Sequence, residues 1–350
     1  MKKRRRGFAK KRVLVLMHEA LVPPAKIEGH SAKEVAEWKT EFDVVAGLTN
    51  LRHEVRPLGV VSELGPIREA IEQWKPHVAF NLLEEFHGIT LYDQHVVSFL
   101  ELMQQPYTGC SPRGLMLAHD KALCKKILSY HRIAAPDFAV FPKGKVVRRP
   151  KRLKFPLLVK SATEEASLGI AQASIVSNDE KLEDRVTFIH EQVGSDALVE
   201  EYIEGRELYV GVMGNLRLTT FPVWEMLFSN MPEGVAHIAT AKVKWDPKYQ
   251  VKHGITTAAA EDLPREVKER LPHLCKRVYR ILGLSGYARL DFRLNEEGKV
   301  YLLEVNPNPN LAYGEDFAES AERTGISYEE LLQRILNLGQ SYRAHWKASF

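Results

Sequence analysis

The sequence is poor in cysteine and contains no long apolar run. Only three of its 350 residues are cysteines, too few and too scattered for a disulfide framework or a zinc site: Cys110, Cys124 and Cys275. This usage is typical of a reducing compartment, so we expect a cytoplasmic protein. No segment is a candidate for a membrane span, and the apolar stretch "VLVLM" at 13–17 is too short for a signal-peptide core.

Common phosphate-binding motifs are also missing. The chain has no Walker pattern and no Gly-x-Gly-x-x-Gly, and "GHS" near Gly29 is neither of these. A phosphate site must therefore be built from other residues. We find no internal repeat and no low-complexity tract beyond the amino terminus.

Excess basic charge is confined to that amino terminus. Residues 1–12, "MKKRRRGFAKKR", carry eight of the 49 Lys and Arg, and without those eight the formal net charge of +4 becomes −4. A short basic tail can contact RNA, ribosomes or anionic lipid. The simpler interpretation is a disordered, solvated tail at 1–11, so we do not assign nucleic acid or membrane as a partner.

Polar side chains are concentrated in the segment 287–310, "YARLDFRLNEEGKVYLLEVNPNPN", which reads as two apolar strands. With period 2, Arg289 and Asp291 share one face of the first strand, and Glu304 and Asn306 share one face of the second. A four-residue turn "NEEG" puts Arg289 opposite Glu304. Asp291 is then the diagonal neighbour of Glu304, at roughly 7 to 8 Å between Cα atoms.

This hairpin has two interpretations. One is a surface hairpin with a salt bridge between Arg289 and Glu304, because exposed faces of antiparallel sheets are normally charged. The other is half of a nucleotide site, because two carboxylates and an amide oxygen are hard ligands suited to Mg²⁺. Pro307 and Pro309 end the strand directly after Asn306 and hold that ligand at a rigid strand end. We favour the nucleotide site.

Residues 287–336 resemble the carboxy-terminal part of an ATP-grasp enzyme, and among these enzymes most closely D-alanine:D-alanine ligase. The resemblance implies that Asp291, Glu304 and Asn306 hold two Mg²⁺ ions on the phosphates of ATP, and Mn²⁺ can substitute for them. It also implies that Arg289 lies over the reacting phosphoryl group as a catalytic residue.

The resemblance covers about residues 76–340 and supplies the other half of the nucleotide site. Its elements are "LAHDKALCKKIL", "FPLLVKSATEEASLGI" and "ALVEEYIEGRELYVGVM". Each element alone is weak evidence for a nucleotide site. Their order and spacing over about 190 residues make the resemblance specific. They imply Lys121 and Lys160 on the α- and β-phosphates, Glu200 on the adenine amino group, the Ile203 backbone on the ring and Glu207 on the ribose hydroxyls.

Strand and helix signals alternate through the chain and, with the resemblance, predict an α/β fold class. We expect an ATP-grasp fold preceded by a Rossmann-like α/β domain. The predicted units are the tail, the first domain, a first grasp lobe, and a second lobe with the metal site and the C-terminal helix, at 1–11, 12–112, 113–200 and 201–350.

Local patterns predict individual elements within these units. In the first domain we expect strands at 12–17, 53–60 and 77–83 and helices at 34–51 and 66–74. At the other end of the chain, Ser327 and Glu330 form a capping-box signal that opens the last helix.

The sequence departs from the D-alanine ligases where those enzymes bind amino acids. Glu19 is the only carboxylate near the end of the first strand, where the family has a Gly-Gly-x-Ser loop and a substrate-binding glutamate. The loop "EEASLG" keeps Ser167, which the resemblance places over the phosphates, but Ala166 replaces the serine before it. Glu315 stands where the family has a substrate-binding serine, and a carboxylate there repels a substrate carboxylate.

The family's lid carries a Lys-Tyr pair, which corresponds here to Lys244 and Trp245. We expect Lys244 to be the catalytic lid lysine on the γ-phosphate. Lys242 is close enough in sequence to remain an alternative.

These observations predict an ATP- and Mg²⁺-dependent ligase that joins a small-molecule carboxylate, an amino acid or peptide, to an amine through an acyl phosphate. Three alternatives stay open: a true D-alanine:D-alanine ligase, a nucleotide-binding protein without ligase activity, and a kinase that stops at the acyl phosphate. The sequence names neither substrate. It does not fix the oligomeric state either, and a homodimer is one of the states left open.

Overall fold

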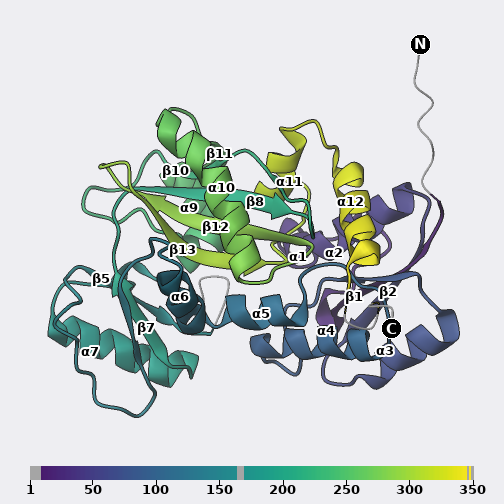
Figure 1. Ribbon diagram of the computed structural model, residues 1–350, viewed down its shortest axis with the longest axis horizontal. Coiled ribbons are helices and arrows are strands. Elements are labelled where there is room, and N and C mark those ends of the chain that lie inside the picture. The colour runs from purple at the N-terminus through teal and green to yellow at the C-terminus, as the bar shows by residue number, and fades with distance from the viewer. Residues whose placement is uncertain (1–8, 164–168, 345–346, 348–350) are drawn as a thin grey trace.

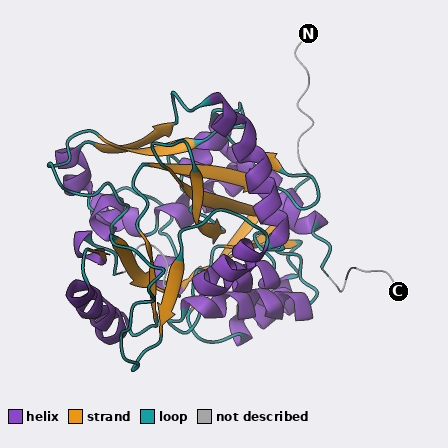
Figure 2. Ribbon diagram, turned by 60° about the vertical axis from the view of Figure 1, so that its left-hand side comes forward, coloured by secondary structure: helices purple, strands orange, loops and turns teal. Residues whose placement is uncertain are grey.

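The computed structural model describes residues 9–163, 169–344 and 347, whose strands form three sheets (Figure 1). The helices lie mainly on the outside of these sheets (Figure 2). Ser167 lies outside the described residues, as does most of the basic tail. Within the described part of the chain, no helix is both long and apolar enough to cross a membrane. The α/β fold class predicted from the sequence is confirmed.

The first sheet is parallel, with the strand order β2-β1-β3. Its strands are β1 Arg12–His18, β2 Glu54–Val60 and β3 Val78–Asn81. Residues 13–17 of β1 are fully buried because both faces of the sheet are covered. Leu14 and Leu16 pack with Val96 and Leu100 of α4 (Asp93–Leu102), and alternate residues of the strand pack on the opposite face.

The structure divides one predicted helix of this domain and adds α4, which was not predicted. The single helix predicted at 34–51 is two helices, α1 (Ala32–Glu37) and α2 (Lys39–Asn50). They are separated by Trp38, whose backbone is not helical, with φ −118° and ψ 19°. The buried Trp38 ring packs edge-on against His30, a tertiary contact that sequence periodicity does not report. The helix predicted at 66–74 is α3 (Gly65–Glu69), which continues as a π-helical turn, η2 (Ala70–Trp74).

The second sheet is antiparallel, with the strand order β4-β7-β5-β6. Its strands are β4 Phe138–Phe141, β5 Leu157–Ser161, β6 Ile175–Val176 and β7 Ala197–Glu201. Val159 and Val199 pack against Val186 of α7 (Asp179–Phe188). The helices of this part are α5 Pro112–His119, α6 Lys121–Tyr130 and α7 Asp179–Phe188, with the short turns η4 Gln172–Ser174 and η5 Ile189–Val193.

The third sheet has the order β11-β10-β8-β12-β13, with β9 paired to β8. Its strands are β8 Arg206–Met213, β9 Thr219–Thr220, β10 Trp224–Phe228, β11 Ile255–Ala259, β12 Tyr287–Leu294 and β13 Val300–Pro307; its helices are α8 Ala241–Trp245, α9 Pro247–His253 and α10 Arg265–Ile281. Leu290 and Phe292 of β12 pack with Leu271 and Val278 of α10. Because side chains alternate along a strand, Arg289, Asp291 and Arg293 must lie on the other face.

The chain ends with α11 (Asp316–Glu322) and α12 (Tyr328–Ser341). As predicted, Ser327 caps α12, since its hydroxyl accepts a hydrogen bond from the Glu330 backbone N–H at 3.4 Å. The Glu330 side chain, the other half of the predicted capping box, accepts from Arg334 instead. The apolar face of α12 packs on α2 and β3, so the last helix returns to the first domain (Figure 1). Two short turns, η1 Glu19–Leu21 and η3 Thr90–Tyr92, complete the described elements.

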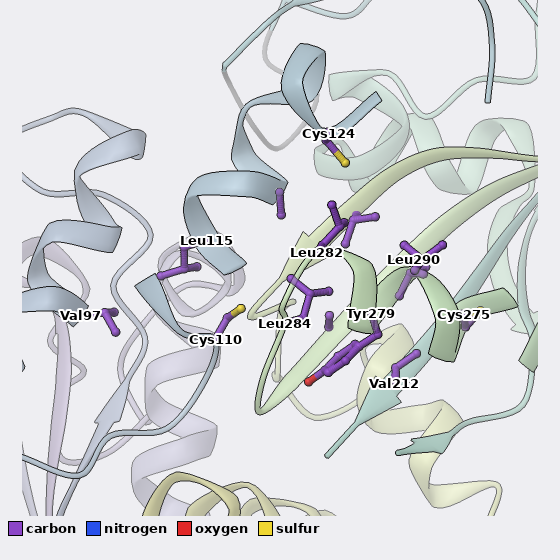
Figure 3. Packing of buried hydrophobic residues seen from close by; sticks show 14 of the residues in the cluster. Val97, Cys110, Leu115, Cys124, Val212, Cys275, Tyr279, Leu282, Leu284 and Leu290 are labelled. Carbon is purple, nitrogen blue, oxygen red and sulfur yellow. The ribbon is translucent and has the colours of Figure 1, made fainter. Parts of the chain in front are cut away.

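All three cysteines are free and buried in apolar surroundings, at separate places in the core (Figure 3). Burial raises the pKa of the Cys110 and Cys124 thiols to about 12, and it raises the pKa of the Cys275 thiol as well. A thiol that does not ionise is neither a nucleophile nor a metal ligand. The cysteines therefore act as apolar core residues.

Candidate functional site

The hairpin of β12 and β13 places Asp291 directly opposite Glu304, and Arg289 opposite Asn306. The predicted register, with Arg289 opposite Glu304, is wrong for two reasons. The turn is one residue longer than assumed, because the Asn295 backbone N–H donates to the Lys299 carbonyl at 3.1 Å. A β-bulge after Asp291 then adds one residue to β13. The two carboxylates are therefore direct cross-strand neighbours, closer together than predicted.

Arg289 pairs with Asp291 on its own strand. Its Nε and Nη2 donate to the two carboxylate oxygens at 2.8 and 3.0 Å, which is a bidentate contact. The guanidinium lies over the ring of Tyr209, 4.8 Å from its centroid, and Nη1 lies 3.8 Å from Asp316 Oδ2. Asp291 is only 5 % exposed, so the interpretation as a surface hairpin with an Arg289–Glu304 salt bridge is excluded.

The oxygens of the hairpin suit a hard divalent cation. The Asn306 amide nitrogen donates to Asp291 Oδ2 at 2.9 Å, which leaves its carbonyl oxygen on the same face as the two carboxylates. Among the described residues no group of three His, Cys, Asp or Glu is arranged to hold a metal. Two carboxylates and one amide oxygen fill only part of the coordination shell of a metal ion. Mg²⁺ accepts such an incomplete set of protein ligands because it takes its remaining ligands from water and from substrate phosphate.

Lys121 faces this set of oxygens from α6. Asp120 caps the helix by accepting from the Leu123 backbone N–H at 2.8 Å, so that Lys121 stands in the first helical turn. Its ammonium lies 2.9 Å from Glu304 Oε1. Burial alone would raise the pKa of the Glu304 carboxyl, but the ammonium groups of Lys121 and Lys160 outweigh it and lower that pKa to about 2. Glu304 is therefore a carboxylate at neutral pH.

Glu200, at the end of β7, is held between two lysines. Lys160 of β5 lies 2.9 Å from its Oε1, and Lys125 of α6 lies 2.9 Å from its Oε2. Burial acts to raise the pKa of the Glu200 carboxyl, but the two ammonium groups together lower it. Lys125 was not identified from the sequence. Its spacing of four residues from Lys121 on a helix, which puts both lysines on one face, was the available signal.

Glu207 is held in a similar way by Arg293, the next residue on the polar face of β12. Arg293 Nη2 donates to Glu207 Oε2 at 2.7 Å, and the Tyr209 hydroxyl donates to Glu207 Oε1 at 2.8 Å. Arg293 also donates to the backbone carbonyls of Gly205 and His237. The alternation of side chains along a strand puts Arg293 on the same face as Asp291, so Arg293 could have been identified from the sequence. Its pairing with Glu207 of β8 could not be identified in that way.

Most of the predicted site residues line one cleft between the second and third sheets. The cleft encloses about 790 Å³, its open mouth included. The predicted residues that line it are Lys121, Lys160, Glu200, Ile203, Glu207, Lys244, Asp291 and Glu304. Lys242 is exposed and does not line the cleft, so of the two lid candidates Lys244 is the one that faces it. The cleft therefore brings together seven predicted charged residues, each from a different helix or strand.

The two predicted substrate residues lie elsewhere. Glu19 is exposed in η1, just after β1, and Glu315 stands at the start of α11; neither lines the cleft. The Glu315 side chain makes no capping hydrogen bond. Partial desolvation raises the pKa of its carboxyl, and the neighbouring Asp316 carboxylate adds to that rise. Ser167 lies outside the described residues.

Comparison with known proteins gives consistent matches. Residues 127–337 match the family model described as the D-ala D-ala ligase C-terminus. A D-alanine–D-alanine ligase of Desulforudis audaxviator is 30% identical over 89% of this chain and 96% of its own length. One from Syntrophotalea carbinolica is 31% identical over 88% and 92%. The crystal structure of the Bacillus anthracis D-alanine–D-alanine ligase complexed with ATP superposes with a TM-score of 0.71, at 25% identity, over 94% of this chain and 97% of that one.

Proposed function

We propose that this chain, which belongs to the D-alanine–D-alanine ligase family and is an ATP-dependent carboxylate–amine ligase of that type, works on substrates other than two D-alanines. One observation carries the proposal. The nucleotide cleft keeps its charged residues, while the position beside Arg289 that should receive the amine is acidic. The two halves of the site have thus diverged to different extents.

ATP occupies the cleft between the sheets in this proposal. Lys121 and Lys160 bind the α- and β-phosphates, and Lys244 meets the γ-phosphate. Glu200 accepts from the adenine amino group, the Ile203 backbone contacts the ring, and Glu207 accepts from the ribose hydroxyls. Each of these residues lines the cleft, which supports the assignment. Ser167 is proposed to cover the phosphates.

Asp291, Glu304 and Asn306 would hold the Mg²⁺ that accompanies ATP, and the metal would offset charge on the transferring phosphoryl group. Their support is the chemistry of the set: two carboxyl groups directly opposite each other and an amide oxygen on the same face. The Lys121 ammonium lies 2.9 Å from Glu304 Oε1 and holds that carboxylate in the cleft.

The reaction proceeds in two steps. An oxygen of the substrate carboxylate attacks the γ-phosphorus of ATP, which gives an acyl phosphate and ADP. The amine nitrogen then attacks the acyl carbon, the tetrahedral intermediate expels phosphate, and the nitrogen loses a proton to leave an amide. Arg289 stabilises the oxyanion. Its Nε and one N–H of Nη2 donate to Asp291, which leaves the N–H groups of Nη1 and the second N–H of Nη2 for that task. The protein acts chiefly by positioning and charge.

The surroundings of Arg289 support a particular class of amine. Asp316 lies 3.8 Å from its Nη1, and Glu315 precedes Asp316 at the start of α11. Two carboxyl groups there disfavour a free substrate carboxylate by charge repulsion. The amine substrate would therefore have no free carboxylate at this position: the carboxylate would be missing, amidated or bound at another place. An amine with a second cationic group would also fit. Glu19, at the end of β1, is proposed to bind the amino group of the acid substrate.

A true D-alanine–D-alanine ligase is the second candidate, favoured by relatives of that name at about 30% identity over most of the chain. A cytoplasmic location is part of the proposal, supported by three free, buried cysteines. A homodimer is proposed as the oligomeric state and would be checked by sedimentation.

The deciding experiment is a screen of phosphate release from ATP. The purified protein with ATP and Mg²⁺ is tested against amino acids, amino-acid amides, diamines and dipeptides, singly and in pairs, and products are identified by mass. We expect turnover with an amine that lacks a free α-carboxylate. Efficient conversion of D-alanine alone to its dipeptide would replace our proposal with the second candidate. No phosphate release with any pair would contradict ligase chemistry at this site.

A further inference from the structure

Lys125 has no role in the nucleotide site as proposed above, yet it is among the most buried charged residues of the protein. Its ammonium lies 2.9 Å from Glu200 Oε2, and its side chain is 3 % exposed. The Lys160 ammonium lies 2.9 Å from the other oxygen, Oε1. One buried carboxylate is therefore shared by two buried cations, one from α6 and one from β5.

The two lysines differ in what they can reach. Lys160 lines the cleft, whereas Lys125 does not. Phosphate oxygens are strong acceptors for an ammonium group, so in the nucleotide complex proposed above Lys160 would leave Glu200 for the phosphates. Lys125 does not line the cleft, so it would keep its contact with Glu200.

The charge of Glu200 determines what the site can recognise. An ionised carboxylate only accepts hydrogen bonds, so Glu200 can accept from the 6-amino group of adenine but offers no donor to the 6-oxo group of hypoxanthine. A buried carboxyl without a cation takes up a proton and becomes a donor as well. The distinction between the two bases would then be lost.

We propose that Lys125 is a positioning residue that keeps Glu200 ionised after Lys160 has moved to the phosphates, and so sets the preference for a 6-amino purine nucleotide. This inference rests on the proposed nucleotide site. Helix α6 would serve both ends of the nucleotide. Lys121 contacts the Glu304 carboxylate of the metal set, and Lys125, one helical turn later, contacts the base-reading carboxylate.

The test compares affinities for ATP and inosine triphosphate, two nucleotides that differ at position 6 of the purine. Dissociation constants are measured by calorimetry with the full chain and Mg²⁺. The wild type should prefer ATP, and Lys125→Met should reduce the ratio of the two constants by about tenfold or more, chiefly through weaker ATP binding. Lys126→Met is the matched control, because Lys126 is the next residue of α6 and is exposed. It should leave the ratio unchanged.

A merely structural role for Lys125 would lower thermal stability without changing the ratio. If Lys125→Met does not fold, Lys125→Gln, which keeps a polar group beside Glu200, is measured in its place. A double-mutant cycle adds a second criterion. In the Glu200→Gln background, Lys125→Met should change the ratio no further, because its effect acts through the carboxylate.

The outcomes separate this inference from the proposed function. Failure of the wild type to bind either nucleotide contradicts both. A wild type that binds ATP and inosine triphosphate equally contradicts this inference alone, as does a Lys125→Met variant with the wild-type ratio. Additive effects of Lys125→Met and Glu200→Gln would also overturn it.

Discussion

Asp291 and Glu304 lie directly opposite each other on β12 and β13, because a β-bulge follows Asp291. Each carboxylate is neutralised by a different cation: Arg289 binds Asp291 at 2.8 Å, and Lys121 binds Glu304 at 2.9 Å. These contacts hold both carboxylates in position in a buried place. A divalent cation bound there, as we propose, would meet two carboxylates that are already oriented.

Glu304→Gln should abolish turnover while ADP still binds, because the amide keeps the shape of the side chain but loses the charge of one proposed metal ligand. We expect the rate of phosphate release at saturating Mg²⁺ to fall at least about a hundredfold. Glu297→Gln, in the exposed turn of the same hairpin, is the matched control and should keep wild-type activity. Unchanged turnover in Glu304→Gln would refute the metal assignment.

Lys160→Ala should raise the KM for ATP, because a buried cation that binds phosphate is lost. A charge-assisted hydrogen bond of about 1.5 to 3 kcal/mol corresponds to a rise of about ten- to a hundredfold. Glu200 keeps Lys125 as a partner in this variant, so the protein should still fold. Steady-state kinetics measure the effect. Lys154→Ala, exposed just before the same strand, should behave as wild type, and an equal rise there would argue against a specific phosphate contact.

Glu315→Ser should improve the use of amines that carry a free carboxylate. Removal of one repulsive carboxylate should raise kcat/KM for D-alanine as the sole amino acid by about tenfold, or about 1.4 kcal/mol. The alternative is that Glu315 only suits the positive start of α11. In that case the serine variant gains no activity with D-alanine. Wild type that already joins two D-alanines efficiently would contradict the specificity argument.

Glu41 should make stability depend on pH. Burial in α2 raises the pKa of its carboxyl from 4.5 to about 7. Below pH 4.5 both the folded and unfolded states are protonated, so burial carries no ionisation cost. Between about pH 4.5 and 7 only the unfolded state ionises, and the free energy of unfolding falls by up to about 3 kcal/mol; above pH 7 the loss is constant.

Glu41→Gln should remove this dependence. We expect the variant to be more stable than wild type at pH 8 and nearly equal to it at pH 4.5, as measured by urea unfolding at both values. Glu37→Gln, exposed at the end of the preceding helix, is the control. The same stability difference for Glu41→Gln at both pH values would show that the folded-state pKa is not raised.

Removal of residues 1–8 should leave fold and activity unchanged. A chain that begins at Ala9 keeps Lys11, whose backbone carbonyl accepts from the Glu54 N–H at 2.8 Å and so extends the pairing of β1 with β2. We expect the melting temperature to shift by less than about 2 °C. A larger loss would mean that the tail packs on the folded body.

The sequence by itself determined the chemistry of the site and the face on which much of it lies. Period 2 placed Arg289 with Asp291, and Glu304 with Asn306, because side chains alternate along any strand. The capping of α12 by Ser327 was also readable, since a helix cap is made by residues three apart. Both rules are local, so neighbouring residues in the chain carry the whole signal.

Tertiary structure decided which residues meet. The bulge after Asp291 changed the partner of every residue beyond it, because register depends on both strands and on the turn between them. Lys125 of α6 meets Glu200 of β7 only in the folded chain, where their charged groups lie 2.9 Å apart. The return of α12 to α2 and the break of the helix at Trp38 follow from apolar surfaces that come together across the fold. Contacts between distant segments form where burial lowers the free energy of the whole chain, and a local pattern contains no record of them.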